Sequence, residues 1–257
     1  MTTKLHFVID KTIKNGFFKK TILKKYKNYS PRFANFIIVI GGDGFMLESL
    51  KKFQKFNKPF YGMNKGTFGF LMNKFDLKKL DKRVNRAKQI KVCPLSMNAI
   101  TKNNIKKKAI AINEISLFRQ SRQTASLKIQ CGKNILIKKL ISDGVLVSTP
   151  AGSTAYNLSV HGPILSLDSN KIAITPISPF RPRRWKGKVI SHNNIIKINN
   201  LNIKKRPISV VADNVEVRNI KSVNIKVDTT ISFKLLYDKN NSLTKKIKLE
   251  QLRKQTA

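Results

Sequence analysis

Acidic residues, cysteines and long apolar runs are all scarce in this chain. Asp and Glu number 13 against 52 Lys and Arg, and two cysteines occur, Cys93 and Cys131. The cysteines are far apart and lack the spacing of a metal or redox site, so we expect idle thiols in a reducing compartment, the cytoplasm. Because no uncharged apolar run reaches about 18 residues and the first residues lack a signal-peptide core, the sequence predicts neither a transmembrane helix nor export.

The excess of basic residues gives a formal net charge of +39, which ordinarily indicates a nucleic-acid or anionic-membrane ligand. Here the basic residues are mostly Lys and are spread along the whole chain. Lys, Asn and Ile are also enriched together, as in residues 102–108, and a coding bias toward A and T produces this combination without selection for binding. We therefore expect neither nucleic acid as the primary ligand nor a membrane partner. A basic nucleic-acid-binding protein stays an alternative.

The apolar pattern predicts two domains. Residues 4–10, 33–40 and 59–63 have the pattern of strands, and residues 11–26, 45–56 and 76–88 that of helices. This alternation predicts a parallel sheet with ligands at the carboxyl ends of its strands. Short runs rich in Val, Ile, Thr and Ser then follow one another and predict a β-rich domain. We expect domains at 1–92 and 93–232, and a segment 233–257 that returns to the first domain with an amphipathic helix at 243–252.

The first candidate site directly follows the apolar run 36–40. It consists of Gly41, Gly42, Asp43 and Gly44. Glycines let a phosphate approach the backbone N–H groups, and the helical spacing of 45–56 places the loop at a helix N-terminus, which favours anions. Because a carboxylate repels phosphate, we interpret Asp43 as a base or a metal ligand. A simple turn is the alternative, since the loop is neither a Walker loop nor a Gly-x-Gly-x-x-Gly fingerprint.

A second candidate is the pair Asn113 and Glu114, which stands between Ile112 and Ile115. The neighbours predict an apolar strand with two polar side chains inside it. Buried polar groups are costly unless they are paired, so these two either meet polar neighbours or bind the hydroxyls of a ligand. A ribose diol offers two adjacent donors that suit a carboxylate and an amide.

The richest polar segment runs from residue 143 to residue 159 and begins with an acid and a glycine. Its hydroxyl groups, on Ser153, Thr154 and Ser159, can donate and accept hydrogen bonds, and Tyr156 offers a face on which an adenine can stack. The alternative is a tight turn with Ser153 or Thr154 as a helix N-cap. A cap explains one hydroxyl but not their density, so we favour a ligand site.

Together these motifs resemble those of the NAD kinase family, bacterial type, whose members phosphorylate NAD to NADP. The matching segments are 41–44, 64–71, 113–114 and 143–159, in the family's order and over most of the chain. The resemblance implies an α/β, Rossmann-like N-terminal domain and a β-rich, β-sandwich-like C-terminal domain. Diacylglycerol and sphingosine kinases share the first loop, so a lipid or other small-molecule kinase is the alternative, but their Gly-Thr-x-Asn-Asp segment does not occur here.

The resemblance also implies a role for each matching residue. Asp43 is expected to accept the proton of the adenosine 2′-hydroxyl. Contacts to NAD are implied for Asp43, Gly44, Phe70, Asn113, Glu114, Asp143, Thr154, Ala155, Tyr156, Asn157, Leu158, Ser159, Ser178 and Asp213. Contacts to the phosphate donor are implied for Gly41, Gly42, Arg183 and Arg184, although the Arg-rich segment 180–187 can also be a solvated loop or a subunit contact.

Two positions depart from the family pattern. Asn214 stands where a His often follows the Asp, so a role for this position is not implied, and Phe45 stands where many members have Thr, which predicts a change in packing. The family further implies ATP or polyphosphate as the donor and a divalent metal, Mg²⁺, that comes with ATP rather than a metal site of the protein. It implies no tightly bound cofactor, and a homodimer or homotetramer that serves NADP biosynthesis.

Overall fold

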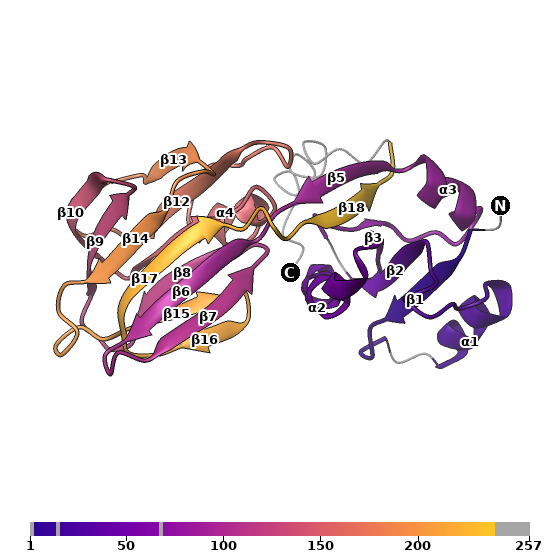
Figure 1. Ribbon diagram of the computed structural model, residues 1–257, viewed down its shortest axis with the longest axis horizontal. Coiled ribbons are helices and arrows are strands. Elements are labelled where there is room, and N and C mark those ends of the chain that lie inside the picture. Colours follow the sequence, from indigo (N-terminus) through magenta and orange to yellow (C-terminus); the bar gives the residue numbers. More distant parts are fainter. Residues whose placement is uncertain (1–2, 14–15, 67–68, 240–257) are drawn as a thin grey trace, which may run out of the picture. The chain divides into compact units, whose positions relative to one another are not determined.

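The computed structural model describes residues 3–13, 16–66 and 69–239, which form two compact units (Figure 1). Unit 1 contains the described residues up to Val92 and those from Ser232 onward, and unit 2 is Cys93–Ile231. The helix predicted at 243–252, and positions 67 and 68 of the segment 64–71, lie outside the described residues. Within the described part of the chain, no helix is long and apolar enough to cross a membrane.

Unit 1 is built on a mainly parallel sheet. Its strands follow the order β1-β2-β3-β18-β5, with β4 beside β3, and β5 alone runs antiparallel to its neighbour. The elements are β1 Leu5–Ile9, α1 Gly16–Lys25, β2 Phe36–Gly41, α2 Asp43–Phe53, η1 Gln54–Phe56, β3 Pro59–Asn64, β4 Asn73–Lys74, α3 Leu80–Arg86, β5 Lys88–Val92 and β18 Phe233–Tyr237. The predicted α/β class of this part is confirmed.

The central strands β2 and β3 of unit 1 are largely apolar because parallel strands in the middle of a sheet are covered on both faces. Residues 37–40 of β2 are fully buried, as expected for a central strand. The helix predicted at 76–88 is shorter in the structure: α3 begins only at Leu80. Asp76 instead accepts the N–H of Lys78 in a turn, and Lys79 adopts a left-handed backbone with φ of 50°, so a helix cannot run through these residues.

Unit 2 consists of two antiparallel sheets with six strands each among the described residues. The first sheet has the order β10-β9-β14-β17-β6-β7 and the second β13-β12-β11-β8-β15-β16. The strands are β6 Leu95–Thr101, β7 Lys106–Ala111, β8 Glu114–Arg119, β9 Ala125–Cys131, β10 Asn134–Ser142, β11 Gly144–Ser148, β12 Lys171–Ile177, β13 Lys188–Ser191, β14 Ile196–Asn200, β15 Ile208–Ala212, β16 Val215–Val217 and β17 Ile220–Val227. The predicted β-rich C-terminal domain is confirmed.

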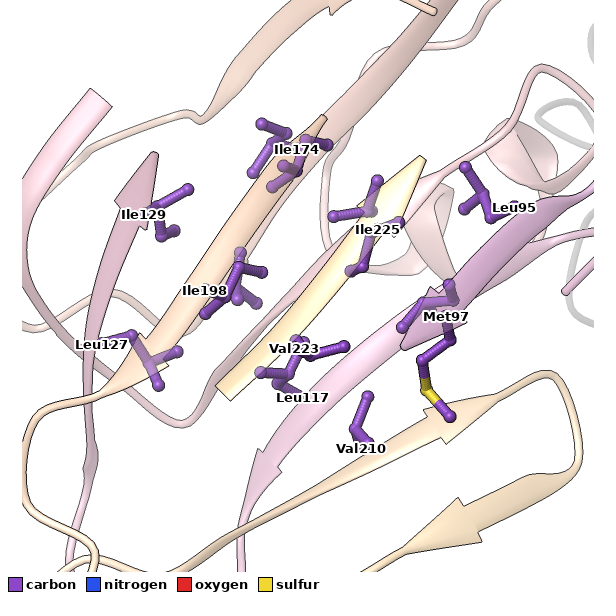
Figure 2. Packing of buried hydrophobic residues seen from close by; sticks show 14 of the residues in the cluster. Leu95, Met97, Leu117, Leu127, Ile129, Ile174, Ile198, Val210, Val223 and Ile225 are labelled. Carbon is purple, nitrogen blue, oxygen red and sulfur yellow. The ribbon is translucent and has the colours of Figure 1, made fainter. Parts of the chain in front are cut away.

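The two sheets of unit 2 share one apolar core. Figure 2 shows side chains of the first sheet, among them Ile198 and Val223, gathered with Leu117, Ile174 and Val210 of the second. Each of these side chains is fully buried, and such burial contributes about 1.5–3 kcal/mol per residue.

Side chains alternate between the two faces of a strand, so the second sheet also has an outer face that points away from this core. Three short elements follow one another in the chain between β11 and β12. They are η2 Gly152–Thr154, α4 Tyr156–Ser159 and the turn that follows them. The ring of Tyr156 stacks on that of Phe118, and Asn157 bonds Thr175. The segment predicted as a ligand site is therefore packed on the outer face.

Candidate functional site

Asp43 occupies the junction between β2 and α2. It is the first residue of the helix and follows Gly42, which has an extended backbone. Its two carboxylate oxygens accept backbone N–H groups, one from Phe70 at 2.7 Å and one from Leu71 at 3.0 Å. These bonds fix the orientation of the carboxylate and bring the two predicted loop motifs of unit 1 to one place.

The close approach of these loops depends on small residues. A Cβ at Gly69 would lie 2.9 Å from Oδ1 of Asp43, and a Cβ at Gly41 would lie 2.8 Å from the ring of Phe45. The ring of Phe45 thus packs against the loop. The first N–H groups of a helix lack partners within the helix, so α2 offers an anion a site beside a half-buried carboxylate.

In unit 2 Asn113 lies in the connection between β7 and β8, and Glu114 is the first residue of β8, so the prediction that both lie inside one strand is wrong. β7 ends at Ala111 and β8 begins with Glu114. The chain turns here because the carboxylate of Asp213 accepts three successive backbone N–H groups. These come from Ile112 at 2.8 Å, Asn113 at 3.0 Å and Glu114 at 3.4 Å.

Two acceptors of this turn are buried without a hydrogen-bond partner among the described residues. They are Oδ1 of Asn113 and Oε2 of Glu114. Burial, and to a smaller extent the nearby carboxylate of Asp213, raises the pKa of the Glu114 carboxyl to about 7. Unpaired buried acceptors are rare, and a carboxyl that titrates near neutrality is typical of a functional site. The pair is thus suited to receive hydroxyl donors from a ligand.

Tyr156 lies among several predicted site residues. Its ring stacks on Phe118 with centroids 5.8 Å apart and planes inclined by 27°. Burial raises the pKa of the Tyr156 hydroxyl, and the charges of Glu114 and Asp143 raise it further, so both carboxyls are near this ring. Asp143 is itself paired with Arg119, whose Nε lies 2.6 Å from Oδ1. The outer face therefore brings an aromatic stack together with two acids.

The predicted hydroxyl cluster is largely buried and bonded within the protein. Ser153 Oγ donates to Pro150 O at 2.7 Å and accepts Leu165 N at 3.0 Å, and Thr154 Oγ1 donates to the carbonyl of Ala151 at 3.5 Å. The alternative of a hydroxyl N-cap is wrong, because the N-cap of α4 is Ala155 and no side chain caps it.

Asn157 is fully buried as well. Its amide donates to the carbonyls of Ser153 and Pro163, and its oxygen accepts the hydroxyl of Thr175 at 2.7 Å. The remaining residues of the predicted segment are more accessible: Ala155, Tyr156 and Leu158 are half-buried, and Ser159 is exposed.

Four further predicted site residues are exposed. Gly44 lies in the first turn of α2, Ser178 follows β12, and Arg183 and Arg184 lie in the Arg-rich segment, where the guanidinium of Arg183 stands 5.4 Å from the ring centre of Phe180. Gly41 and Gly42 belong to unit 1 and the two arginines to unit 2.

Two residues of the site were missed by sequence reasoning. Phe118 lies beneath Tyr156, and Thr149 clamps the Asn113 turn: its N–H donates to Asn113 O at 2.9 Å and its hydroxyl to Ile112 O at 2.7 Å. Phe118 is four residues after Glu114 and thus on the same face of β8, a spacing that could have indicated it. Thr149 lies within the predicted segment 143–159 but was not singled out as a site residue.

Comparisons with known proteins identify the family of this chain. The family model of the ATP-NAD kinase N-terminal domain matches residues 5–89, and that of the ATP-NAD kinase C-terminal domain matches residues 112–239. The NAD kinase of Brucella suis biovar 1 is 43% identical over 249 residues, 97% of each chain, and that of Zymomonas mobilis subsp. mobilis is 49% identical over 232 residues, 90% of each.

Two solved structures share the fold. The crystal structure of yeast NADH kinase complexed with NADH has a TM-score of 0.78 and 20% identity, covering 99% of this chain and 89% of the other. An NAD kinase from Archaeoglobus fulgidus in complex with ATP has a TM-score of 0.75 and 22% identity, covering 96% and 99%. With both family models matched in order and relatives this similar over nearly the full length, the chain belongs to the NAD kinase family.

Proposed function

We propose that the protein transfers the terminal phosphoryl group of ATP to the 2′-hydroxyl of the adenosine ribose of NAD and so produces NADP. The observation that carries this proposal is the carboxylate of Asp43, which two backbone N–H groups hold at the N-terminus of α2. An oriented carboxylate next to a site for anions is what the transfer of a phosphoryl group to a hydroxyl requires. Membership of the NAD kinase family supports the choice of substrates.

In the proposed reaction Asp43 accepts the proton of the 2′-hydroxyl. The 2′-oxygen forms a bond to the terminal phosphorus, the bond from that phosphorus to the bridging oxygen breaks, and ADP leaves. Transfer of this kind has a loose transition state, so positioning contributes more than the strength of the base. The N–H groups of Phe70 and Leu71 provide that positioning by holding both oxygens of the carboxylate.

We propose that the turn and the aromatic stack of unit 2 bind the adenosine part of NAD. The unpartnered acceptors of Asn113 and Glu114 receive ribose hydroxyls, and Tyr156, supported from below by Phe118, stacks on the adenine. Contacts to NAD are also proposed for Gly44, Phe70, Asp143, Thr154, Ala155, Asn157, Leu158, Ser159 and Ser178, whereas the carboxylate of Asp213 bonds the backbone of residues 112–114. For the buried members, Thr154 and Asn157, the backbone or a changed rotamer would make the contact.

For the phosphate donor we propose the backbone of Gly41 and Gly42 together with Arg183 and Arg184. Mg²⁺ is commonly held by one or two carboxylates and the phosphates of the substrate. We therefore propose that the metal ion enters with ATP and that the phosphates supply most of its ligands. When bound, such an ion neutralises charge on the phosphates.

Three further properties belong to the same proposal. Polyphosphate is a second candidate donor, since the strongly basic chain attracts polyanions. A cytoplasmic location agrees with Cys93 and Cys131, which are both free thiols. A homodimer or homotetramer is the expected assembly, and light scattering of the purified protein would measure it.

The experiment that tests the proposal compares NADP formation by the wild-type protein, Asp43→Asn and Asp81→Asn. Asp81 is a matched control, because it is also an acid in the first turn of a helix of unit 1 but is exposed. With NAD and Mg-ATP we expect Asp43→Asn to lose about 10²–10⁴-fold in kcat and to keep NAD binding in calorimetry, while Asp81→Asn stays at the wild-type rate. A folded wild-type protein that forms no NADP from either ATP or polyphosphate would contradict the proposal and direct the search to lipid substrates.

A further inference from the structure

Asp213 lies in the turn between β15 and β16 and has a left-handed backbone with φ of 51°. Its carboxylate accepts the N–H groups of Ile112, Asn113 and Glu114, and its own N–H donates to Glu114 O at 3.2 Å. Two turns that are about 100 residues apart in the chain are thus bonded to each other in both directions.

Other contacts fix the same backbone from a second side. The N–H of Thr149 donates to Asn113 O, and its hydroxyl donates to Ile112 O. Gly152 packs so closely that a Cβ there would lie 2.2 Å from Asn113 O. The backbone of residues 112–114 is therefore bonded through its N–H groups and its carbonyls, while Oδ1 of Asn113 and Oε2 of Glu114 stay unpartnered among the described residues.

We infer that Asp213 is a positioning residue of the reaction, which fixes the 112–114 turn so that the side chains of Asn113 and Glu114 face the ribose of NAD. This inference rests on the proposed NAD contacts of those two side chains. Because all three N–H groups of the turn are bonded to Asp213, neither side chain can fold back onto its own backbone. Preorganisation of this kind lowers the entropic cost of binding.

The charge of Asp213 has a second effect, which acts on the proton affinity of Glu114. The ionisable groups near this carboxyl are Asp213 from the β15–β16 turn and the Tyr156 hydroxyl from α4. Burial and the Asp213 charge together raise the pKa of Glu114 to about 7. Removal of the charge is therefore expected to lower this pKa, although removal of the N–H bonds loosens the turn. The lower pKa of Glu114 strengthens NAD binding near neutral pH, whereas the looser turn weakens it at every pH. Measurements over a range of pH therefore separate the two effects.

The test is Asp213→Asn, which keeps the shape of the side chain, removes its charge and places an amide donor against backbone donors. The measured quantities are kcat, and KM for NAD as a function of pH. Above about pH 8, where Glu114 is ionised in both proteins, we expect KM to rise about tenfold and kcat to change less than about twofold. The pH at which KM changes is expected to fall below the wild-type value, because Glu114 stays ionised to lower pH.

The matched control is Asp228→Asn. Asp228 is also a turn aspartate of unit 2 and accepts the N–H and hydroxyl of Thr230, so this variant loses the same charge at another turn. It is expected to keep the wild-type kcat, KM and pH profile. If Asp213→Asn lowers the melting temperature but keeps the wild-type KM and pH profile, Asp213 is structural only and the inference is overturned.

A third variant, Glu114→Gln, separates this inference from the proposed function. A raised KM in Glu114→Gln together with an unchanged KM in Asp213→Asn rejects the positioning role and leaves the NAD contact intact. An unchanged KM in Glu114→Gln at every pH rejects the NAD contact itself, and the positioning role with it. If KM rises in Glu114→Gln and in Asp213→Asn, and the pH profile shifts in Asp213→Asn but not in Asp228→Asn, the NAD contact and the positioning role are both supported.

Discussion

Asp43 in unit 1 and Glu114 in unit 2 are both half-buried acids at element junctions, but their surroundings differ. Both oxygens of Asp43 accept backbone N–H groups, whereas Oε2 of Glu114 is buried without a partner among the described residues. The protein thus supplies fixed donors to one carboxyl and leaves an acceptor open on the other. A fixed orientation suits a group that takes part in a reaction, and an open acceptor suits a group that binds a ligand.

The largest effect is expected from Gly69→Ala, which disturbs Asp43 without changing it. The new Cβ would lie 2.9 Å from Oδ1 of Asp43, so the carboxylate must move. We expect kcat to fall about 100-fold with little change in KM. Gly66→Ala is the control in the same loop, since its nearest neighbour is an ordinary contact at 3.5 Å. Equal rates for the two variants would show that the position of Asp43 does not matter.

The next largest effect is expected on the free energy of unfolding. The buried, unpartnered carboxyl of Glu114 destabilises the folded protein when it is ionised. The pKa of Glu114 is raised by folding to about 7, so its protonated form stabilises the folded state below the unfolded pKa, and this stability is lost as the pH rises through about 7. Glu114→Gln resembles the protonated form at every pH. We expect it to be more stable than the wild type by about 3 kcal/mol near pH 8 and about equal to it near pH 4 in urea unfolding.

If Glu114→Gln and the wild type differ by the same free energy of unfolding at both pH values, the carboxyl does not titrate in the folded protein as expected. Asp228→Asn serves again as a control, because no buried unpartnered oxygen is found on that side chain.

A smaller effect is expected on the binding of NAD. Ribose hydroxyls donate to the ionised carboxyl, so the wild-type KM for NAD should decrease as the pH rises through about 7. Glu114→Gln should show a KM that is independent of pH and about tenfold above the wild-type value near pH 8. Initial rates over a range of pH measure both. A wild-type KM that is flat across neutral pH would contradict this prediction.

The smallest effect is expected at the ion pair of Arg119 with Asp143. The pair is short, 2.6 Å, but both side chains keep more than a third of their exposure. Such a pair contributes about 0.2–1 kcal/mol in water. We expect Arg119→Met to change the free energy of unfolding by less than about 1 kcal/mol, and this difference to vanish in high salt. A larger loss would indicate that Arg119 supports the outer face in another way.

Local sequence patterns were enough to predict much of the fold and the candidate site in unit 1. The apolar run 36–40 and the helical spacing after it predicted the junction that holds Asp43, because the signals lie next to each other in the chain. The strand β12 was not predicted, and it contains Pro176, a residue that is rare within sheets.

The site of unit 2 was harder to predict because its determinants are not local. Ile112 and Ile115 flank the polar pair as they would in one strand, and the residue that turns the chain, Asp213, comes about 100 positions later. Likewise the composition of residues 153–157 cannot distinguish hydroxyls that bind a ligand from those that, like Ser153, bond a carbonyl three residues earlier. The predicted contacts of these residues with NAD stay predictions.

The order of strands in unit 1 has a consequence for the growing chain. β18, whose residues Phe233 and Leu235 are almost fully buried, lies between β3 and β5 but is made only after all of unit 2. While the ribosome synthesises residues 93–231, the first sheet has a gap and exposes two unpaired edges, which are prone to pair with other chains. Unit 2, in contrast, has every strand of its sheets in one continuous stretch and can close first. Premature termination before residue 233 therefore yields a finished sandwich attached to a sheet that cannot be completed.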